Sequence, residues 1–277
     1  MSVSLPNNIG TGVALKINYV AQGRGAPLLM IHGIAASLHD WDFLLPAAAR
    51  AGYAGYALDL LGHGESGKPA ARAYQLDWMV DHFMAWVDSL HLDQPAVLIG
   101  HSLGGYLALE YARRFPSRTR GLVLVNPYYS NQQLPNLLRL TYRHSVLGGL
   151  IADRTPGWLF RIAVDLTSMA MGHSTGARHS LPEAVRAQTA LDYARTAPGV
   201  YNIPNTGIDF TPHLGSITQP TLVAWGERDQ TLAPGSFLRL VAALPNGRGA
   251  SIRAGHVPHQ SNAEWFNPLV LDFLKTL

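Results

Sequence analysis

The sequence predicts an α/β domain that carries a long helical insertion. Short apolar runs at residues 53–60, 95–99 and 121–125 are typical of buried strands. Between the first two runs, apolar residues recur every three or four positions, which predicts a helix packed on a sheet. After residue 128 no strand-like run follows until residues 220–225. Strands that alternate with helices indicate the α/β class, and the strand-free stretch indicates the insertion.

The remaining elements follow in order along the chain. Val13, Leu15, Ile17 and Tyr19 alternate with smaller or polar residues, which predicts an antiparallel strand with one wet face. The helix between the first strand runs has five apolar residues at helical spacing, namely Leu76, Met79, Phe83, Trp86 and Leu90. Helices are also predicted within the insertion, around 134–142, 158–171 and 181–194, and at the end of the chain, after residue 261.

Composition limits the class of protein. With 277 residues, of which 47% are hydrophobic and 14% charged, the chain suits one globular domain with a sizeable insertion. The net charge is only +3 and no short run is rich in lysine and arginine, so a nucleic acid is not expected as a partner. Cysteine is absent, which excludes disulfides, thiolate metal sites and a cysteine nucleophile.

The sequence gives two indications of location. No apolar run reaches the roughly 18 residues of a membrane span. The first eight residues lack a basic segment followed by an apolar one, so they do not form a secretory signal as given. We therefore expect a cytoplasmic protein without a membrane span. The oligomeric state is not predicted.

The segment Gly100-His101-Ser102-Leu103-Gly104 matches the G-x-S-x-G pattern of a nucleophile elbow. It follows the apolar run 95–99 and precedes a stretch that can be helical until Phe115-Pro116. A serine on such a sharp turn needs small residues two positions away on either side, because a Cβ there would collide with the adjoining strand or helix. Ser102 is therefore the candidate nucleophile.

Four further segments resemble landmarks of one family. Residues 27–33 resemble a strand that ends in His-Gly, and residues 58–66 are similar to a D-x-x-G-x-G-x-S loop. Residues 223–229 look like the strand end that carries a catalytic acid, and residues 254–259 look like the loop with a catalytic histidine. With the elbow among them and in this order, the chain resembles the α/β-hydrolase family, and within it the capped serine hydrolases that are esterase- or lipase-like.

The resemblance implies a specific architecture. The family's fold is a mostly parallel, doubly wound sheet with helices on both faces and a helical cap inserted late in the sheet. On this basis residues 1–127 and 213–277 form the α/β-hydrolase core, and residues 128–212 form the cap.

The resemblance also implies a catalytic triad in the chain order serine, acid, histidine. Ser102, Asp229 and His256 satisfy this order, and each lies in a loop directly after a predicted strand. His259 is the competing base and Glu227 the competing acid. The G-x-x-D pattern at 226–229 favours Asp229, and the loop position after the last strand favours His256.

An acyl transfer site must also stabilise an oxyanion with backbone N–H groups. Leu103, at the start of the helix after the nucleophile, is the first predicted donor. The second is Ile34, after His32-Gly33, with Ala35 as the alternative.

Six residues are predicted to line the substrate pocket. Five are apolar or aromatic residues of the predicted cap, and the sixth follows the candidate histidine. They are Tyr128, Tyr129, Trp158, Met169, Met171 and Val257.

The function expected from these residues is hydrolysis of a small-molecule carboxylic ester through an acyl-enzyme on Ser102. The serine argues against dehalogenases and epoxide hydrolases of this fold, which use aspartate. Two alternatives remain: a hydrolase of carbon–carbon bonds in ring-cleavage products, and a hydrolase-fold protein that binds a ligand without turnover. Neither a cofactor nor a metal is expected, since no metal-ligand motif such as H-E-x-x-H occurs in the sequence.

Overall fold

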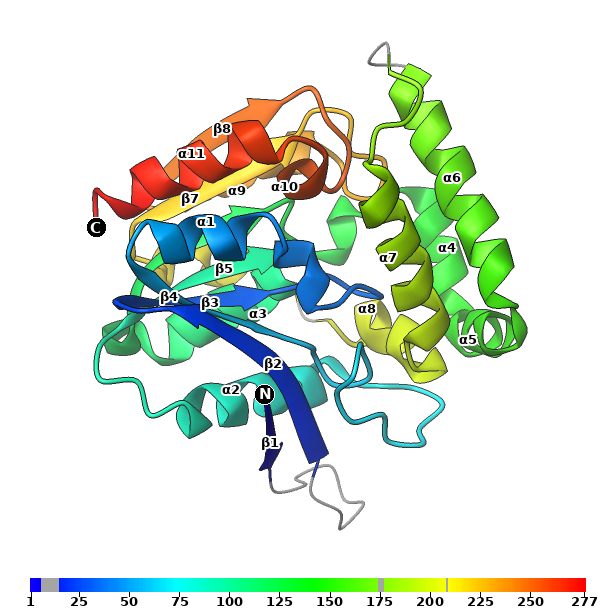
Figure 1. Ribbon diagram of the computed structural model, residues 1–277, viewed down its shortest axis with the longest axis horizontal. Helices are drawn as coiled ribbons and strands as arrows, with labels where there is room; N and C mark the ends of the chain where they lie inside the picture. The colour runs from blue at the N-terminus through cyan, green and yellow to red at the C-terminus, as the bar shows by residue number, and fades with distance from the viewer. Residues whose placement is uncertain (6–14, 174–176, 208) are drawn as a thin grey trace.

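An eight-stranded sheet forms the centre of the protein (Figure 1). The computed structural model describes residues 1–5, 15–173, 177–207 and 209–277. The strands lie in the order β1-β2-β4-β3-β5-β6-β7-β8. Their bounds are β1 Ser2–Leu5, β2 Leu15–Gly23, β3 Ala26–Ile31, β4 Tyr53–Leu58, β5 Ala96–His101, β6 Thr119–Val125, β7 Thr221–Gly226 and β8 Gly247–Ile252.

The sheet is parallel from β4 to β8 and antiparallel only at its N-terminal edge. β2 pairs antiparallel with both β1 and β4, while every later neighbour is parallel. The predicted antiparallel strand is therefore confirmed over its described part, and Val13 lies outside the described residues. At the other edge, β8 pairs with β7 alone among the described residues.

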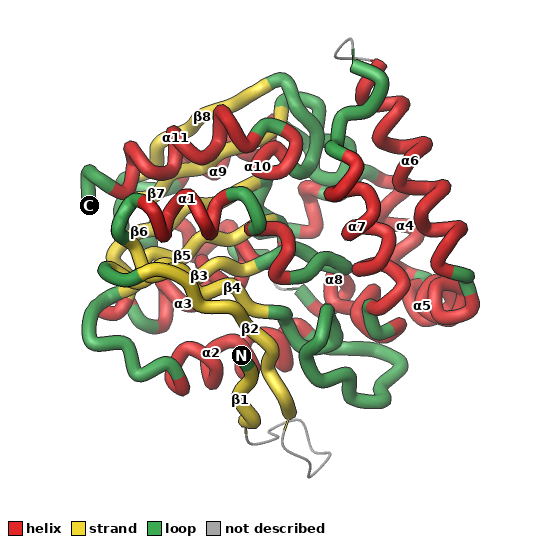
Figure 2. The backbone as a smooth tube through the Cα atoms, viewed as in Figure 1, coloured by secondary structure: helices red, strands yellow, loops and turns green. Residues whose placement is uncertain are grey.

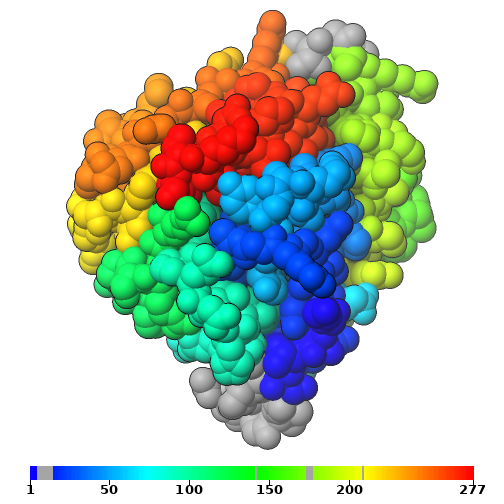
Figure 3. All heavy atoms as spheres, turned by 60° about the vertical axis from the view of Figure 1, so that its left-hand side comes forward, coloured from blue at the N-terminus to red at the C-terminus, as the bar shows by residue number. Residues whose placement is uncertain are grey.

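Helices cover both faces of the sheet (Figure 2). On one face, α1 (Leu44–Arg50) and α11 (Ala263–Leu274) lie side by side (Figure 3). The other face packs against α2 (Leu76–Ser89), α3 (Leu103–Arg114) and α9 (Gly235–Ala243). Val97 of β5 packs in the hydrophobic core between the sheet and α1 and α11, and Leu98 packs in the core on the opposite face. A strand buried on both faces needs such an unbroken apolar run, and the doubly wound prediction is confirmed.

The described residues between β6 and β7 form helices and no strand. The helices are α4 Asn136–Arg143, α5 Ser145–Arg154, α6 Gly157–His173, α7 Glu183–Arg195 and α8 Ile203–Thr206. Three 3₁₀ turns accompany them, η3 Asn131–Gln133, η4 Pro198–Asn202 and η5 Thr211–Ser216. α4 to α7 gather on one side of the sheet (Figure 1). The division into a core and a cap at residues 128 and 212 stays a prediction.

Three short elements complete the described chain, η1 Leu38–Trp41, η2 Pro116–Arg118 and α10 Pro258–Ser261. Among the described residues, no helix combines the length and the apolar character that a membrane crossing requires.

Candidate active site

Ser102 lies at the junction of β5 and α3 in a backbone conformation that L-residues rarely adopt, with φ 50° and ψ −113°. The residues two positions before and after it must be glycine for steric reasons. A Cβ on Gly100 would lie 2.3 Å from the carbonyl oxygen of Gly104, and a Cβ on Gly104 would lie 2.1 Å from that of Ile31. Both obstacles are backbone atoms, which cannot move aside as a flexible side chain can. The glycines thus allow the tight turn that projects Ser102.

We expect Gly104→Ala to lower the free energy of unfolding by about 3 kcal/mol or more, because the new Cβ overlaps the β3 backbone. Gly148→Ala is the matched control. It also lies within a helix, α5, but its Cβ would meet no atom within 4 Å, so the better helix propensity of alanine should stabilise the protein by up to about 1 kcal/mol. Urea unfolding of both variants measures the difference. Equal stabilities would contradict the steric role of Gly104.

Asp229 and His256 form a hydrogen-bonded pair at the ends of β7 and β8. His256 Nδ1 lies 2.7 Å from Asp229 Oδ2, and because a carboxylate only accepts, Nδ1 carries the proton. The Asp229 side chain is fully buried, while that of His256 is 21% exposed. Burial by itself would raise the pKa of Asp229, but His256 and the hydrogen bonds from Asn126 and Leu232 hold that pKa below its ordinary value. Asp229 therefore stays ionised.

Asn126 is a site residue whose role the sequence did not reveal. Its Nδ2 donates to Asp229 Oδ2 at 2.6 Å, and its Oδ1 accepts from the Gly226 N–H at 3.3 Å. The residue directly follows β6 with φ 40°, a conformation that asparagine tolerates better than most residues. Asn126 thus connects the end of β6 to the acid at the end of β7.

The ring of His32 connects the loop after β3 to the loop after β4. His32 Nδ1 donates to the Gly33 carbonyl at 2.6 Å, while His32 Nε2 accepts from the Leu60 N–H at 2.9 Å. Burial lowers the pKa of His32, which agrees with this neutral tautomer. A Cβ on Gly33 would lie 3.2 Å from the Cβ of Ser102, so the glycine lets the loop approach the nucleophile.

Ile34 and Ala35 follow Gly33 and line the same cavity as Ser102. Leu103 is the first residue of α3. The roles of Ile34 and Leu103 as oxyanion donors stay predictions.

The competing candidates lie elsewhere. Glu227 accepts a hydrogen bond from Ser251 Oγ at 2.9 Å on the exposed side of β8. His259 is 2% exposed and packs against Trp41 and Phe266. Burial lowers the pKa of His259 to about 4, so its ring is neutral. Asp229, and not Glu227, contacts His256.

A cavity of about 840 Å³ lies between the sheet and the helices of the insertion, and both Ser102 and His256 line it. Its wall toward the insertion is mixed. The larger apolar side chains there are Leu138, Phe160, Val164, Met171 and Leu181, and polar groups such as Thr167, Ser168, Gln188 and Thr189 lie among them. Of the six predicted pocket residues, Met171 and Val257 line the cavity.

The other four predicted pocket residues lie outside the cavity lining. Tyr128 and Tyr129 are buried in the core beside the sheet, where their hydroxyls donate to Asn131 Oδ1 and the Ser236 carbonyl. Trp158 is 62% exposed. The face of α6 that meets the cavity carries residues 160, 164, 168 and 171, spaced by three or four, and Trp158 and Met169 fall outside that stripe. The assignment of these four residues to the substrate pocket stays a prediction that the lining of this cavity does not support.

Asp192 of α7 places a buried carboxyl group in the cavity wall. Ser37 Oγ donates to its Oδ2 and Gln188 Nε2 to its Oδ1, both at 2.9 Å. Burial raises the pKa of Asp192 to about 6. The contact with Ser37 connects α7 to the loop that follows β3.

We expect Asp192 to make stability depend on pH. Because its folded pKa lies above the unfolded value, the folded state alone keeps the proton between about pH 4 and 6, so the free energy of unfolding falls as pH rises through that interval. The decrease due to this group is at most about 3 kcal/mol. Asp192→Asn should remove it, as seen by urea unfolding of both proteins at pH 4 and pH 7. Equal changes in the two proteins would exclude this role.

Comparisons with known proteins agree with this geometry. A sequence model described as the alpha/beta hydrolase fold matches residues 26–263. A 2-hydroxy-6-oxononadienedioate/2-hydroxy-6-oxononatrienedioate hydrolase of Paraburkholderia xenovorans is 27% identical over 280 residues, which cover 94% of this chain and 91% of that protein.

Two solved structures share the fold. A thermophilic esterase from Thermogutta terrifontis has a TM-score of 0.81 at 21% identity, covering 100% of this chain and 98% of that one. A bromoperoxidase from Bacillus anthracis has a TM-score of 0.82 at 24% identity, covering 99% and 100%. The chain belongs to the α/β-hydrolase fold family, and its general activity is that of a hydrolase.

Proposed function

We propose that this protein is a serine hydrolase that cleaves carboxylic esters through Ser102, His256 and Asp229. The observation that carries the proposal is the 2.7 Å hydrogen bond from His256 Nδ1 to the buried carboxylate of Asp229. It is made at a cavity that Ser102 also lines. A serine on a strained turn, beside a histidine oriented by a carboxylate, is the arrangement that acyl transfer requires.

The proposed reaction follows from the tautomer of His256. With the proton on Nδ1 held by Asp229, the lone pair of Nε2 takes the Ser102 proton as Oγ attacks the ester carbonyl. The histidine then protonates the departing alkoxide, which leaves the acyl group on Ser102. In the second half, His256 takes a proton from water as the hydroxide attacks the acyl carbon, and the bond to Ser102 Oγ then breaks while His256 returns the proton to Oγ, which releases the acid. Asp229 stabilises the imidazolium in both halves.

The tetrahedral intermediate carries a negative oxygen that needs donors. We assign this role to the N–H groups of Leu103 and Ile34. Leu103 begins α3, and Ile34 follows Gly33, whose carbonyl accepts a hydrogen bond from His32. Losing one such donor typically costs about 3–4 kcal/mol in the transition state.

A second candidate function is hydrolysis of a carbon–carbon bond in a ring-cleavage product. It is favoured by the sequence relatives, because three 2-hydroxy-6-oxononadienedioate/2-hydroxy-6-oxononatrienedioate hydrolases are each 27% identical over 94–97% of this chain. Leu138, Phe160 and Val164 offer an apolar wall to the acyl chain of an ester, whereas Arg228 and Arg253 of the same cavity lining offer positive charges to the carboxylates of a dienedioate.

Initial rates on p-nitrophenyl esters from acetate to palmitate, beside 2-hydroxy-6-oxononadienedioate, separate the two functions. We expect turnover of esters, with a maximum at the acyl length that fills the cavity. Turnover of the dienedioate alone would support the second candidate. No turnover of either, with an intact fold, would leave ligand binding without catalysis.

A further inference from the structure

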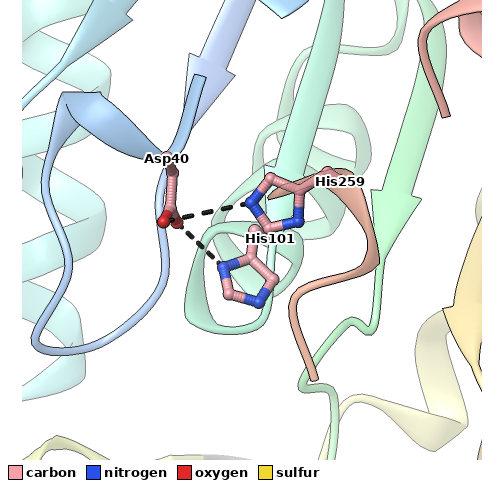
Figure 4. A group of neighbouring side chains, drawn as sticks. All are labelled: Asp40, His101 and His259. Atoms are coloured by element: carbon pink, nitrogen blue, oxygen red, sulfur yellow. Dashed lines mark hydrogen bonds and ion pairs between the residues drawn. The ribbon is translucent and has the colours of Figure 1, made fainter. Parts of the chain in front are cut away.

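Three titratable side chains are buried together, one of them the residue directly before Ser102 (Figure 4). Asp40 comes from η1, His101 from the end of β5 and His259 from α10. Their exposed fractions are 6%, 3% and 2%. Charged groups buried this deeply need partners, so each contact of this cluster calls for a physical account.

Both ring nitrogens of His101 face oxygen atoms that only accept hydrogen bonds. Nδ1 lies 2.9 Å from Asp40 Oδ2, and Nε2 lies 3.1 Å from the carbonyl oxygen of His256. A histidine ring that donates from both nitrogens is an imidazolium. Burial would raise the pKa of Asp40, but His101 and His259 hold that pKa well below its ordinary value. The contacts of both His101 nitrogens are those of an ion pair between Asp40 and an imidazolium.

The ion pair connects the segments that carry the proposed catalytic groups. Asp40 Oδ2 also accepts from the Gly33 N–H at 3.3 Å, and Asp40 Oδ1 accepts from Gln260 Nε2 at 3.1 Å. His101 directly precedes Ser102 and donates to the backbone of His256. Asp40 and His101 thus contact three segments, namely the loop after β3, the nucleophile elbow and the loop after β8 that carries His256.

A metal ion is a competing explanation for this cluster. The ligand atoms of Asp40, His101 and His259 lie within 4.8 Å of one another. The 2.9 Å separation of Nδ1 from Oδ2 is that of a direct hydrogen bond, and a ring that donates from both nitrogens has no lone pair left for a metal. The geometry therefore favours the ion pair.

We propose that Asp40 and His101 are positioning residues, whose ion pair holds Gly33 and the His256 backbone in fixed positions relative to Ser102. This inference rests on the proposed function. Neither residue needs to touch the reacting atoms. His259 fills the space beside the pair, with its ring centroid 4.6 Å from that of His101. Its burial-lowered pKa of about 4 keeps it from adding a second positive charge.

The charge on His101 also acts on the proposed base. The ring centroids of His101 and His256 are 4.9 Å apart, so a positive His101 disfavours a second positive charge on His256. The titratable groups around His101 are Asp40, His256, His259 and His32. Removing the charge should therefore move the acid limb of the pH–rate profile to higher pH. A purely structural role would lower the rate without this shift.

The test compares His101→Gln, Asp40→Asn and the double variant with the parent protein. The main readout is the rate at which a fluorophosphonate labels Ser102, because labelling needs a positioned nucleophile but no particular ester. We expect each single variant to label about 100-fold more slowly, the loss expected when catalytic groups are misplaced by about 1 Å. The double variant should lose no more than either single one, since the two residues act as a unit. His82→Gln is the control, because it changes a buried histidine of α2 and should label like the parent.

A nitrogen NMR spectrum of ¹⁵N-histidine-labelled protein at pH 7.5 tests the charge itself. We expect signals of a ring with both nitrogens protonated that disappear in His101→Gln. Three results would each overturn the proposal. The first is that the single variants label within threefold of the parent rate, and the second is that His101 is neutral. The third is that the parent protein binds one equivalent of a metal, which His101→Gln does not bind. If the parent labels and shows the imidazolium but turns over no ester, the ester function fails and the positioning role stands.

Discussion

Replacing Ser102 by alanine is expected to lower kcat for ester hydrolysis by about 10⁶-fold, the loss seen when a triad nucleophile is removed. The hydroxyl is the only part of the side chain that the proposed reaction uses, and alanine is strained by φ 50° no more than serine is. Rates on the preferred p-nitrophenyl ester measure the loss. Thermal unfolding should be unchanged, because the variant keeps the Cβ and the backbone hydrogen bonds of the elbow.

Covalent labelling provides the control for Ser102→Ala. The parent protein should lose all activity when one fluorophosphonate is attached, and the variant should not be labelled. A variant that keeps kcat within tenfold of the parent would show that Ser102 is not the nucleophile, and the triad would have to be abandoned.

Asp229→Asn should lower kcat by about 10⁴-fold with little change in the fold. The amide keeps the size of the carboxylate but loses its charge, so it no longer stabilises the imidazolium of His256. It can also present an N–H to Nδ1, which favours the tautomer that has its proton on Nε2. In that tautomer His256 cannot accept the Ser102 proton.

Glu227→Gln is the matched control for Asp229→Asn. It is the same chemical change two residues earlier, on a side chain that contacts Ser251 and not His256. We expect kcat within about twofold of the parent, as for most surface changes. A larger loss in Glu227→Gln than in Asp229→Asn would mean that the acid has been assigned to the wrong carboxylate.

Most strands of the sheet could be predicted from the sequence because their signals are local. Buried strands require unbroken apolar runs, and the elbow requires glycine at positions 100 and 104. Helix α5 was not predicted, since Gly148 and Gly149 lower its helix propensity. Gly149 is explained only by tertiary structure, because a Cβ there would lie 2.4 Å from the Pro198 carbonyl oxygen.

The pocket residues were harder to predict for a related reason. Helix α6 has apolar residues on two faces, so periodicity alone cannot tell which face meets the cavity. Phe160 and Val164 line it, whereas Trp158 faces solvent. Asn126 carried a weak signal, an asparagine directly after a buried strand, but its hydrogen bond to Asp229 joins residues 103 positions apart. Contacts over such separations arise only when the chain has folded.

Because β8 lies at the edge of the sheet, the active site can lose its structure under conditions in which the rest of the fold is still stable. This edge strand is held by β7 alone among the described strands, and it leads into the loop that carries His256. Edge strands with exposed residues open locally at a lower free-energy cost than the whole domain. Amide hydrogen exchange in β8 should therefore outpace that in β5, at the centre of the sheet. Local opening of β8 would then set the highest temperature at which the protein is active. Substitutions that stabilise this edge strand would raise that temperature more than substitutions that improve the packing of the core.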